Sequence, residues 1–301
     1  MKRKNNITGF LFASPWIIGF LLFTLYPILI SLYYSATDFS LFKPAVWVGL
    51  ENYKNLFKDA LFVKSLYNTL YMTILGTPIF LFCGLMTALM LNLKVKGQSI
   101  YRTIFFVPAI IPVLATSLVW LWVLNAQSGL LNVVLKIVGI SGPNWLTNSA
   151  YTKLSLIIIG AWGSGQIMII FLASLQDVPK SLYEAAEIDG ASVWKKFLNI
   201  TLPGISPIIF FQLIMGVIAN LQYFTQAYII ASVTSGGGLN SATGGPENSL
   251  LFYALYLYQN GFVYFKMGTA SAMAWILFVI VAAITWLVFK SSAKWVTYGG
   301  E

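Results

Sequence analysis

The sequence predicts an all-α polytopic membrane protein with six transmembrane helices. Of its 301 residues, 58% are hydrophobic and only 9% are charged, whereas an average soluble domain has roughly 25% charged residues. The mean hydropathy is +0.78, and several apolar runs exceed the roughly 20 residues that cross a bilayer as a helix. A water-soluble globular domain is therefore excluded.

Six apolar segments are long enough to cross, and we expect a helix in each: residues 10–35, 66–93, 104–124, 154–175, 205–233 and 267–289. The first contains Pro15 and Pro27, and the third contains Pro108 and Pro112. Kinks are expected there because proline removes a backbone hydrogen bond. The first segment is too long for the apolar core of a signal peptide, so we expect it to remain uncleaved.

Basic residues predict the orientation. With the N-terminus in the cytoplasm, eleven of the 18 Lys and Arg residues lie inside and seven lie outside. The short basic flanks at the N-terminus, between the second and third spans and after the sixth span all agree with this bias. We therefore expect both termini in the cytoplasm.

Several chemistries are excluded by residue type. The chain has no histidine and a single cysteine, Cys83, so it lacks a His-based triad, an internal disulfide and the usual ligands of a zinc site. The cores of the six spans contain no Asp, Glu, His or Lys, which disfavours a membrane enzyme. Basic residues are spread along the loops rather than gathered in a stripe, so no nucleic-acid partner is expected.

Two outer loops differ in character. Residues 38–64 place Trp47, Tyr53 and Phe57 among charged residues, which suits an amphipathic helix at the lipid headgroups. A plain ordered loop fits equally well. Residues 234–248 are rich in glycine and serine and should be irregular.

The longest polar stretch, residues 176–203, connects the fourth and fifth spans; we call it the polar connector. Ser181 and Glu184 have the spacing of a capping box, so a helix should start near Leu182. Asp-Gly at Gly190 predicts a turn with positive φ at the helix end. A second helix should cover about 192–199, with Pro203 stopping it.

The surface of the polar connector suggests docking. The side chains of Ala185 and Ala186 are short, so another backbone or a groove can approach the first helix closely. On the second helix, Trp194, Phe197 and Leu198 have helical spacing, and we expect them to pack on the chain's own membrane helices. A capped connecting loop without a partner is the alternative.

These residues also form a known pattern. Glu184-Ala185-Ala186, Asp189-Gly190-Ala191, Phe197, Ile200 and Leu202-Pro203 resemble the EAA loop of permease subunits from binding-protein-dependent ABC importers. The similarity extends over the whole chain, including residues 9–34, 48–53, 101–108 and 129–132. These segments resemble the carbohydrate-uptake branch that includes the maltose permeases.

The resemblance implies a type I ABC importer permease fold. It implies a second permease, two cytoplasmic ATPase subunits and an external solute-binding protein as partners. It also assigns the ATPase-coupling role, by position, to Glu184, Ala185, Ala186, Asp189, Gly190 and Ala191. The chain has no Gly-x-x-x-x-Gly-Lys-Ser/Thr phosphate loop, so ATP and Mg²⁺ are expected in partner subunits and this subunit is not expected to be an enzyme.

The same resemblance places sugar contacts at Gly163 and Gln166 of the fourth span and at Asn220 and Tyr223 of the fifth. Amide and phenol groups can hydrogen-bond sugar hydroxyls without any charge. Asn220 and Tyr223 share a helical face, whereas Gln222 and Gln226 point nearly the other way. Only one set can therefore line a path unless the helix is broken.

A structural explanation of these polar residues stays open. Gly160 and Ser164 have the spacing of a small-xxx-small helix contact, and the amides can join helices to each other or to a second permease.

We therefore expect a subunit that imports a sugar or oligosaccharide across the bacterial cell membrane. An importer permease for a glycerol phosphate is the nearest alternative, although a phosphate favours Arg or Lys near the path. A passive channel is a further alternative from a different class.

Overall fold

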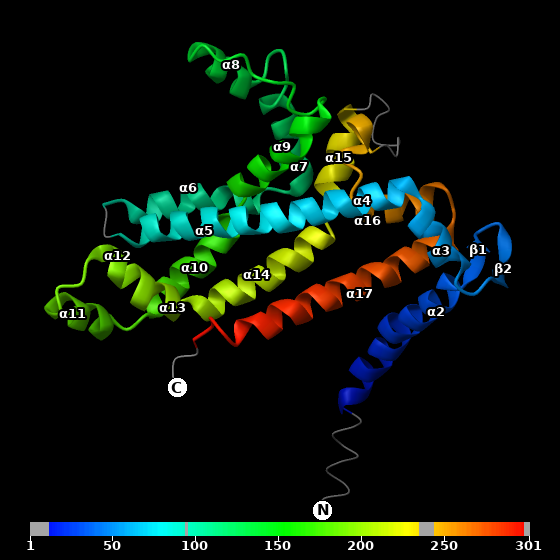
Figure 1. Cartoon of the computed structure of the whole chain (residues 1–301), viewed down its shortest axis with the longest axis horizontal. Coiled ribbons are helices and arrows are strands. Elements are labelled where there is room, and N and C mark those ends of the chain that lie inside the picture. Colours follow the sequence, from blue (N-terminus) through cyan, green and yellow to red (C-terminus); the bar gives the residue numbers. More distant parts are fainter. Residues whose placement is uncertain (1–11, 94–95, 235–243, 298–301) are drawn as a thin grey trace, which may run out of the picture. The chain divides into compact units, whose positions relative to one another are not determined.

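The computed structural model describes residues 12–93, 96–234 and 244–297, which are mainly helical (Figure 1). Four helices are long and apolar enough to cross a membrane: Phe12–Ser35, Ala60–Asn92, Ser206–Thr234 and Met267–Ser292. Two further pairs pass the same test as bent units: Gln98–Ile110 with Val113–Val123, and Ser149–Trp162 with Gly165–Asp177. Six candidate spans result within the described ranges if each bent pair is one span.

The chain divides into two compact units, the first formed by residues up to Ala60 and by Leu257–Val279. Its elements are η1 (Leu21–Leu25), α2 (Tyr26–Ser35), β1 (Thr37–Ser40), β2 (Lys43–Trp47), α3 (Glu51–Lys58), η5 (Gln259–Val263) and the first half of α17 (Met267–Ser292). The Asn52 side chain donates to the carbonyls of Ser35 and Thr37 at 2.9 and 2.8 Å. These bonds fix α3 to the chain that leaves α2.

Residues 38–64 therefore form more than a plain loop. It includes an antiparallel β1–β2 hairpin, in which Thr37 pairs with Trp47, and the short helix α3. Leu56 of α3 is buried while Phe57 is 64% exposed. The hairpin differs from both expectations for this stretch, and the position of α3 at the headgroups stays a prediction.

The second unit contains Leu61–Tyr256 and the chain from Ile280 onward. Its elements are α4 (Ala60–Tyr71), η2 (Met72–Gly76), α5 (Thr77–Asn92), α6 (Gln98–Ile110), α7 (Val113–Val123), α8 (Leu130–Ile137), α9 (Ser149–Trp162), α10 (Gly165–Asp177), α11 (Lys180–Ile188), α12 (Val193–Lys196), η3 (Phe197–Thr201), α13 (Leu202–Gly204), α14 (Ser206–Leu221), α15 (Thr225–Thr234), η4 (Pro246–Asn248) and α16 (Tyr253–Tyr258).

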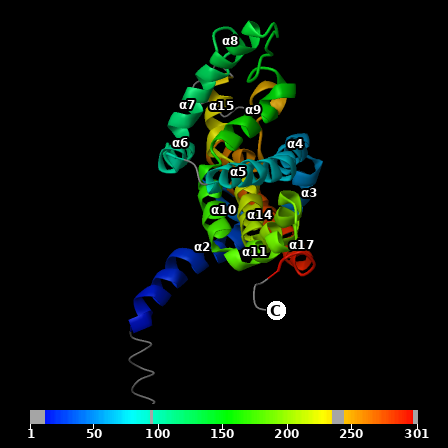
Figure 2. The same cartoon turned by 90° about the vertical axis from the view of Figure 1, so that its left-hand side faces the viewer.

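Helix α5 is the centre of this unit. It packs against α6, α9, α10 and α14, and both views show it beside α10 and α14 (Figures 1 and 2). A Cβ atom on Gly84 of α5 would lie 2.6 Å from Ile167 of α10, and one on Gly216 of α14 would lie 2.8 Å from Thr77. Glycine at these contacts lets the helices approach closely, which is how helices associate where lipid removes the hydrophobic driving force.

The prolines affect the helices unequally. At Pro112 the third span turns by 99°, and Pro112 caps the new helix α7. Pro108, where a kink was also expected, lies inside α6. Wide π-helical turns, η1 and η3, directly precede the helical segments that contain Pro27 and Pro203. Such a turn accommodates the carbonyls that cannot bond to a proline nitrogen.

The fourth span bends by 45° between α9 and α10, and the fifth is interrupted after Leu221, where α14 ends and α15 begins at Thr225. The loop 234–248, expected to be irregular, lies largely outside the described residues. Its described end forms η4, in which Glu247 and Asn248 have positive φ.

Gly165→Ala should destabilise the second unit. The added Cβ would lie 2.5 Å from the Phe105 carbonyl oxygen and 3.1 Å from the Phe106 Cα, and backbone atoms cannot swing aside as a flexible side chain can. The expected loss is about 1–3 kcal/mol, measured as denaturant unfolding of the purified protein in detergent. Gly163→Ala is the control, because its Cβ would meet its nearest neighbour at 3.5 Å. Equal stability of the two variants would contradict the close α6–α10 contact.

Candidate functional site

The polar connector folds as two helices joined by a tight turn. Helix α11 ends at Ile188 with Asp189 as its C-cap, and the next residue, Gly190, has φ +68° as the Asp-Gly pattern predicts. The Ala191 N–H donates to the Ala186 carbonyl at 2.9 Å, and the Gly190 N–H donates to the Glu187 carbonyl at 3.1 Å. This pair of bonds is a Schellman motif, which requires a left-handed residue after the helix.

Two details of the predicted connector are wrong. Helix α11 begins at Lys180 behind Pro179 and has no side-chain cap, so Ser181 lies within the first turn and the expected capping box with Glu184 does not form. The second helix also continues through Pro203 to Gly204, because the π-turn η3 makes room for the proline. Its own start is capped by Ser192, which accepts the Lys195 N–H at 3.4 Å.

Two side-chain contacts hold the connector helices together. Lys196 Nζ donates to Glu187 Oε1 at 2.9 Å, and this hydrogen bond, with the lysine charge, holds the pKa of Glu187 below its ordinary value. Nearer the membrane helices, the hydroxyls of Tyr183 and Thr201 are 2.8 Å apart. The two helices are therefore linked at both ends of their contact.

The packing expected for Trp194 is also wrong. Its side chain is 67% exposed and stacks on Phe197 at 5.5 Å between ring centroids. Trp194 lies too near the tip of the connector for the membrane helices of its own chain to cover it. Tyr183 and Ile200 instead pack against the buried cluster around α5. Ile188 and Val193 are 88% and 81% exposed, so the tip of the connector presents an uncovered apolar surface.

The candidate path residues of the fourth span lie at its bend. Gly163 caps the end of α9, and Gln166, in the first turn of α10, is exposed. Gly160 approaches the Phe80 ring so closely that a Cβ atom would lie 2.3 Å from it. Within this span, Gly160 serves helix packing while the Gln166 amide is accessible.

In the fifth span the polar residues divide differently. Asn220 is 5% exposed and donates through Nδ2 to Thr77 Oγ1 at 2.8 Å. The Tyr223 hydroxyl donates to Gln226 Oε1, so the expectation that Gln226 points away from Tyr223 is wrong, because the helix is interrupted between them. The Tyr223 ring packs edge-on against Phe252. Gln222, at the interruption of the helix, is exposed. The amide of Asn220 thus joins helices, as the structural alternative expects, and the broken helix removes the single-face restriction.

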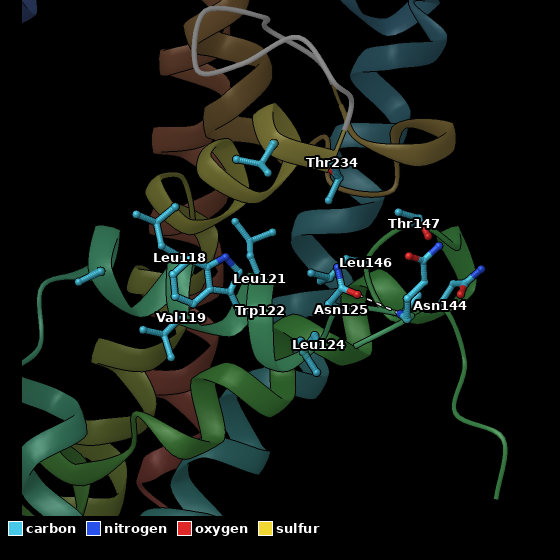
Figure 3. Close-up of a pocket in the computed structure, with 14 residues that line it drawn as sticks. Leu118, Val119, Leu121, Trp122, Leu124, Asn125, Asn144, Leu146, Thr147 and Thr234 are labelled. Atoms are coloured by element: carbon cyan, nitrogen blue, oxygen red, sulfur yellow. Dashed lines mark hydrogen bonds between the residues drawn. The ribbon is translucent and has the colours of Figure 1, made fainter. Parts of the chain in front are cut away.

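A cavity of about 910 Å³, absent from the sequence-based expectations, opens beside α7 and α15. Figure 3 shows Leu118, Leu121 and Trp122 on one side and Asn125, Asn144 and Thr147 on the other, with Thr234 nearby. Asn125, whose side-chain amide directly follows the third span in the sequence, is the signal that could have indicated this site.

Lys153 is a second feature that the sequence analysis missed, because it was assigned to a loop. It lies on α9 and donates to Asn68 Oδ1 at 3.2 Å. Its ammonium is 5.3 and 5.2 Å from the ring centroids of Tyr67 and Tyr71. The hydrogen bond and the two cation–π contacts hold the ammonium group in place within the protein.

Broken apolar helices that carry neutral polar side chains, together with a helix-turn-helix connector, define the class of this chain as a membrane permease. It belongs to the binding-protein-dependent transport system inner membrane component family, whose model matches residues 80–296. The chain is therefore a multi-pass membrane subunit and not an enzyme.

Similar proteins agree with this assignment. The chain is 42% identical to the probable ABC transporter permease protein YesP of Bacillus subtilis, over 98% of this chain and 94% of that protein. It is 32% identical to the arabinooligosaccharides transport system permease protein AraP of the same organism, over 97% and 90% of the two chains. A chain from the crystal structure of a bacterial alginate ABC transporter shares the fold, with a TM-score of 0.81, 22% identity and 97% and 96% coverage.

The Asn220–Thr77 bond should be measurable by a double-mutant cycle. Asn220→Ala and Thr77→Val should each destabilise the protein, and the coupling energy between them should be about 0.5–1.5 kcal/mol. Unfolding free energies of the two single variants and the double variant in detergent give this value. Purely additive losses would show that the two side chains do not interact.

Proposed function

We propose that this chain is a transmembrane subunit of an ATP-driven importer that moves a neutral sugar or oligosaccharide. The observation that carries the proposal is the family membership, combined with 32% identity over nearly the whole chain to a permease named for arabinooligosaccharides. The accessible polar groups at the helix breaks, Gln166 and Gln222, are uncharged. Neutral amides suit sugar hydroxyls.

The proposed assembly contains a second permease, two cytoplasmic ATPases and an external solute-binding protein. The tip of the connector is apolar and includes the exposed side chains of Ile188, Val193 and Trp194. It supports binding of a partner at this place, because contiguous exposed apolar patches mark interaction sites. ATP and Mg²⁺ would bind in the ATPases. Both termini and the connector would then lie in the cytoplasm, in line with the excess of basic residues on that side.

Within this assembly the connector would couple ATPase motion to transport. Glu184, Ala185, Ala186, Asp189, Gly190 and Ala191 would carry this role. The Schellman turn at Gly190 and the Lys196–Glu187 ion pair support it, because they fix the relative angle of the two connector helices. A contact with a fixed shape moves together with the surface that it touches.

The substrate path would pass the breaks of the fourth and fifth spans, with contributions from Gly163, Gln166, Asn220 and Tyr223. Gln166 supports a direct contact because its amide is accessible. Asn220 and Tyr223 would act mainly by holding the broken helix, through Thr77 and Gln226. A glycerol phosphate is less well supported. Lys153 could pair with a phosphate, but its ammonium already donates to Asn68 and contacts the rings of Tyr67 and Tyr71.

Transport should require the complete complex. Proteoliposomes containing both permeases, the ATPases and the binding protein should take up at least one of arabinotriose, lactose and maltose when ATP is present, whereas this chain alone should take up none. Radiolabelled uptake measures both. Sugar transport by the chain alone, or uptake of glycerol 3-phosphate in place of every sugar, would contradict the proposal.

Gly190→Val should uncouple the complex. Nothing lies within 4 Å of the added Cβ, so the effect is backbone strain of about 1–3 kcal/mol from a β-branched residue at positive φ. Sugar-stimulated ATP hydrolysis and uptake should both fall while the subunits still assemble. Gly139→Val is the matched control, with φ +80° and equally open surroundings outside the connector. Normal coupling in Gly190→Val would remove the connector from this role.

A further inference from the structure

We infer that the cavity beside α7 and α15 is a second binding site for a neutral sugar, separate from the path residues at the helix breaks. This inference rests on the proposed function, which it extends by adding a site. The cavity is built by α7, by residues 124–127, by Asn144, Leu146 and Thr147, and by the end of α15. None of Gly163, Gln166, Asn220 and Tyr223 lines it.

The volume and the charge of the cavity favour a small neutral ligand. About 910 Å³ lies within the roughly 300–1,000 Å³ typical of small-molecule sites. Among the described residues that line it there is no Asp, Glu, Lys or Arg. An ionic ligand would lose hydration here without gaining an opposite charge, which makes its binding costly.

One side of the cavity is apolar and aromatic. Trp122 is 80% exposed and lies beside Leu118 and Leu121 (Figure 3). An indole face can stack on the C–H face of a sugar ring, and its N–H can donate a hydrogen bond. A lipid-facing tryptophan at a membrane interface would not need a cluster of amides on the opposite side of the same cavity.

The other side offers fixed hydrogen-bonding groups. Asn125 Oδ1 accepts the N–H groups of Gln127 and Ser128 at 2.9 and 3.0 Å, which orients the amide and leaves its NH₂ group as a donor. The Thr234 hydroxyl donates to the Ile230 carbonyl at 2.8 Å, so its oxygen can accept. Side chains that are already held lose little entropy when they bind a ligand.

Donors, acceptors and an aromatic face around a neutral cavity match the mixed surface of a sugar, which has hydroxyls at its edge and C–H groups on its faces. A purely apolar ligand would leave the NH₂ group of Asn125 and the amide of Asn144 unpaired. The cavity is therefore assigned to a saccharide rather than to a lipid chain.

The test uses the complete importer in nanodiscs without its binding protein. Saturation-transfer NMR is recorded with arabinotriose, lactose and maltose, and uptake is measured in proteoliposomes with the binding protein. Trp122→Leu and Asn144→Ala should each lower the saturation-transfer signal of the bound sugar at least twofold and reduce uptake about two- to tenfold. Trp286→Leu is the control, because Trp286 is a tryptophan of α17 that is 60% exposed and does not line the cavity.

Three results would overturn the assignment. The first is the absence of signal from all three sugars in the wild-type complex. The second is a wild-type signal in both Trp122→Leu and Asn144→Ala. The third is loss of the second permease from either variant on purification, which would make the cavity a contact between permeases. Failure of the proposed function is distinct, because it appears as a wild-type complex that takes up no sugar.

Discussion

The close approach of helices to α5 is the contact on which the rest of the second unit depends. In a bilayer, burying apolar side chains between helices gains little over leaving them in lipid, so association relies on tight packing and on hydrogen bonds between helices. Gly84, Gly160 and Gly216 each bring a neighbouring helix to a distance that excludes a Cβ atom. The Asn220–Thr77 bond adds a polar link from α14 to α5 at 2.8 Å. Helices α9, α10 and α14, which carry the breaks with polar residues, are thereby arranged around one central helix.

The polar connector is attached to the same core. Val178, near its start, and Ile205, two residues after its end, are buried in the cluster that also contains Ala88 and Leu91 of α5. Tyr183 and Ile200 pack on this cluster from within the connector. The tip of the connector, by contrast, is apolar and uncovered. The connector follows α10 and precedes α14 in the sequence. A rigid base and an exposed tip therefore suit it to carry a displacement from a partner into these two helices.

Much of this organisation could be predicted from the sequence, and the failures have physical causes. Apolar length predicted the membrane helices, and Asp189-Gly190 predicted the turn with positive φ because it depends on local chemistry. Pro108 and Pro112 look equivalent in the sequence, yet the chain turns at the second of them while the first lies inside α6. The partner of Asn220 is 143 residues away, so its bond to Thr77 had no local signal. The cavity combines Trp122, Asn144 and Thr234, which only the fold brings together.

The central claim is that α5, α14 and the connector move as one body. Double electron–electron resonance tests it in the complete importer, in a Cys83→Ser background, with spin labels at Ile188 of the connector and at Met90 of α5, which are 88% and 69% exposed. A second pair joins Met90 to Phe211 of α14, which is 50% exposed. The account predicts that both distances are the same in the nucleotide-free and ATP-bound states, while the distance from Ile188 to a label on an ATPase subunit or on the second permease changes. An Ile188–Met90 distance that changes while the Met90–Phe211 distance stays constant would contradict it.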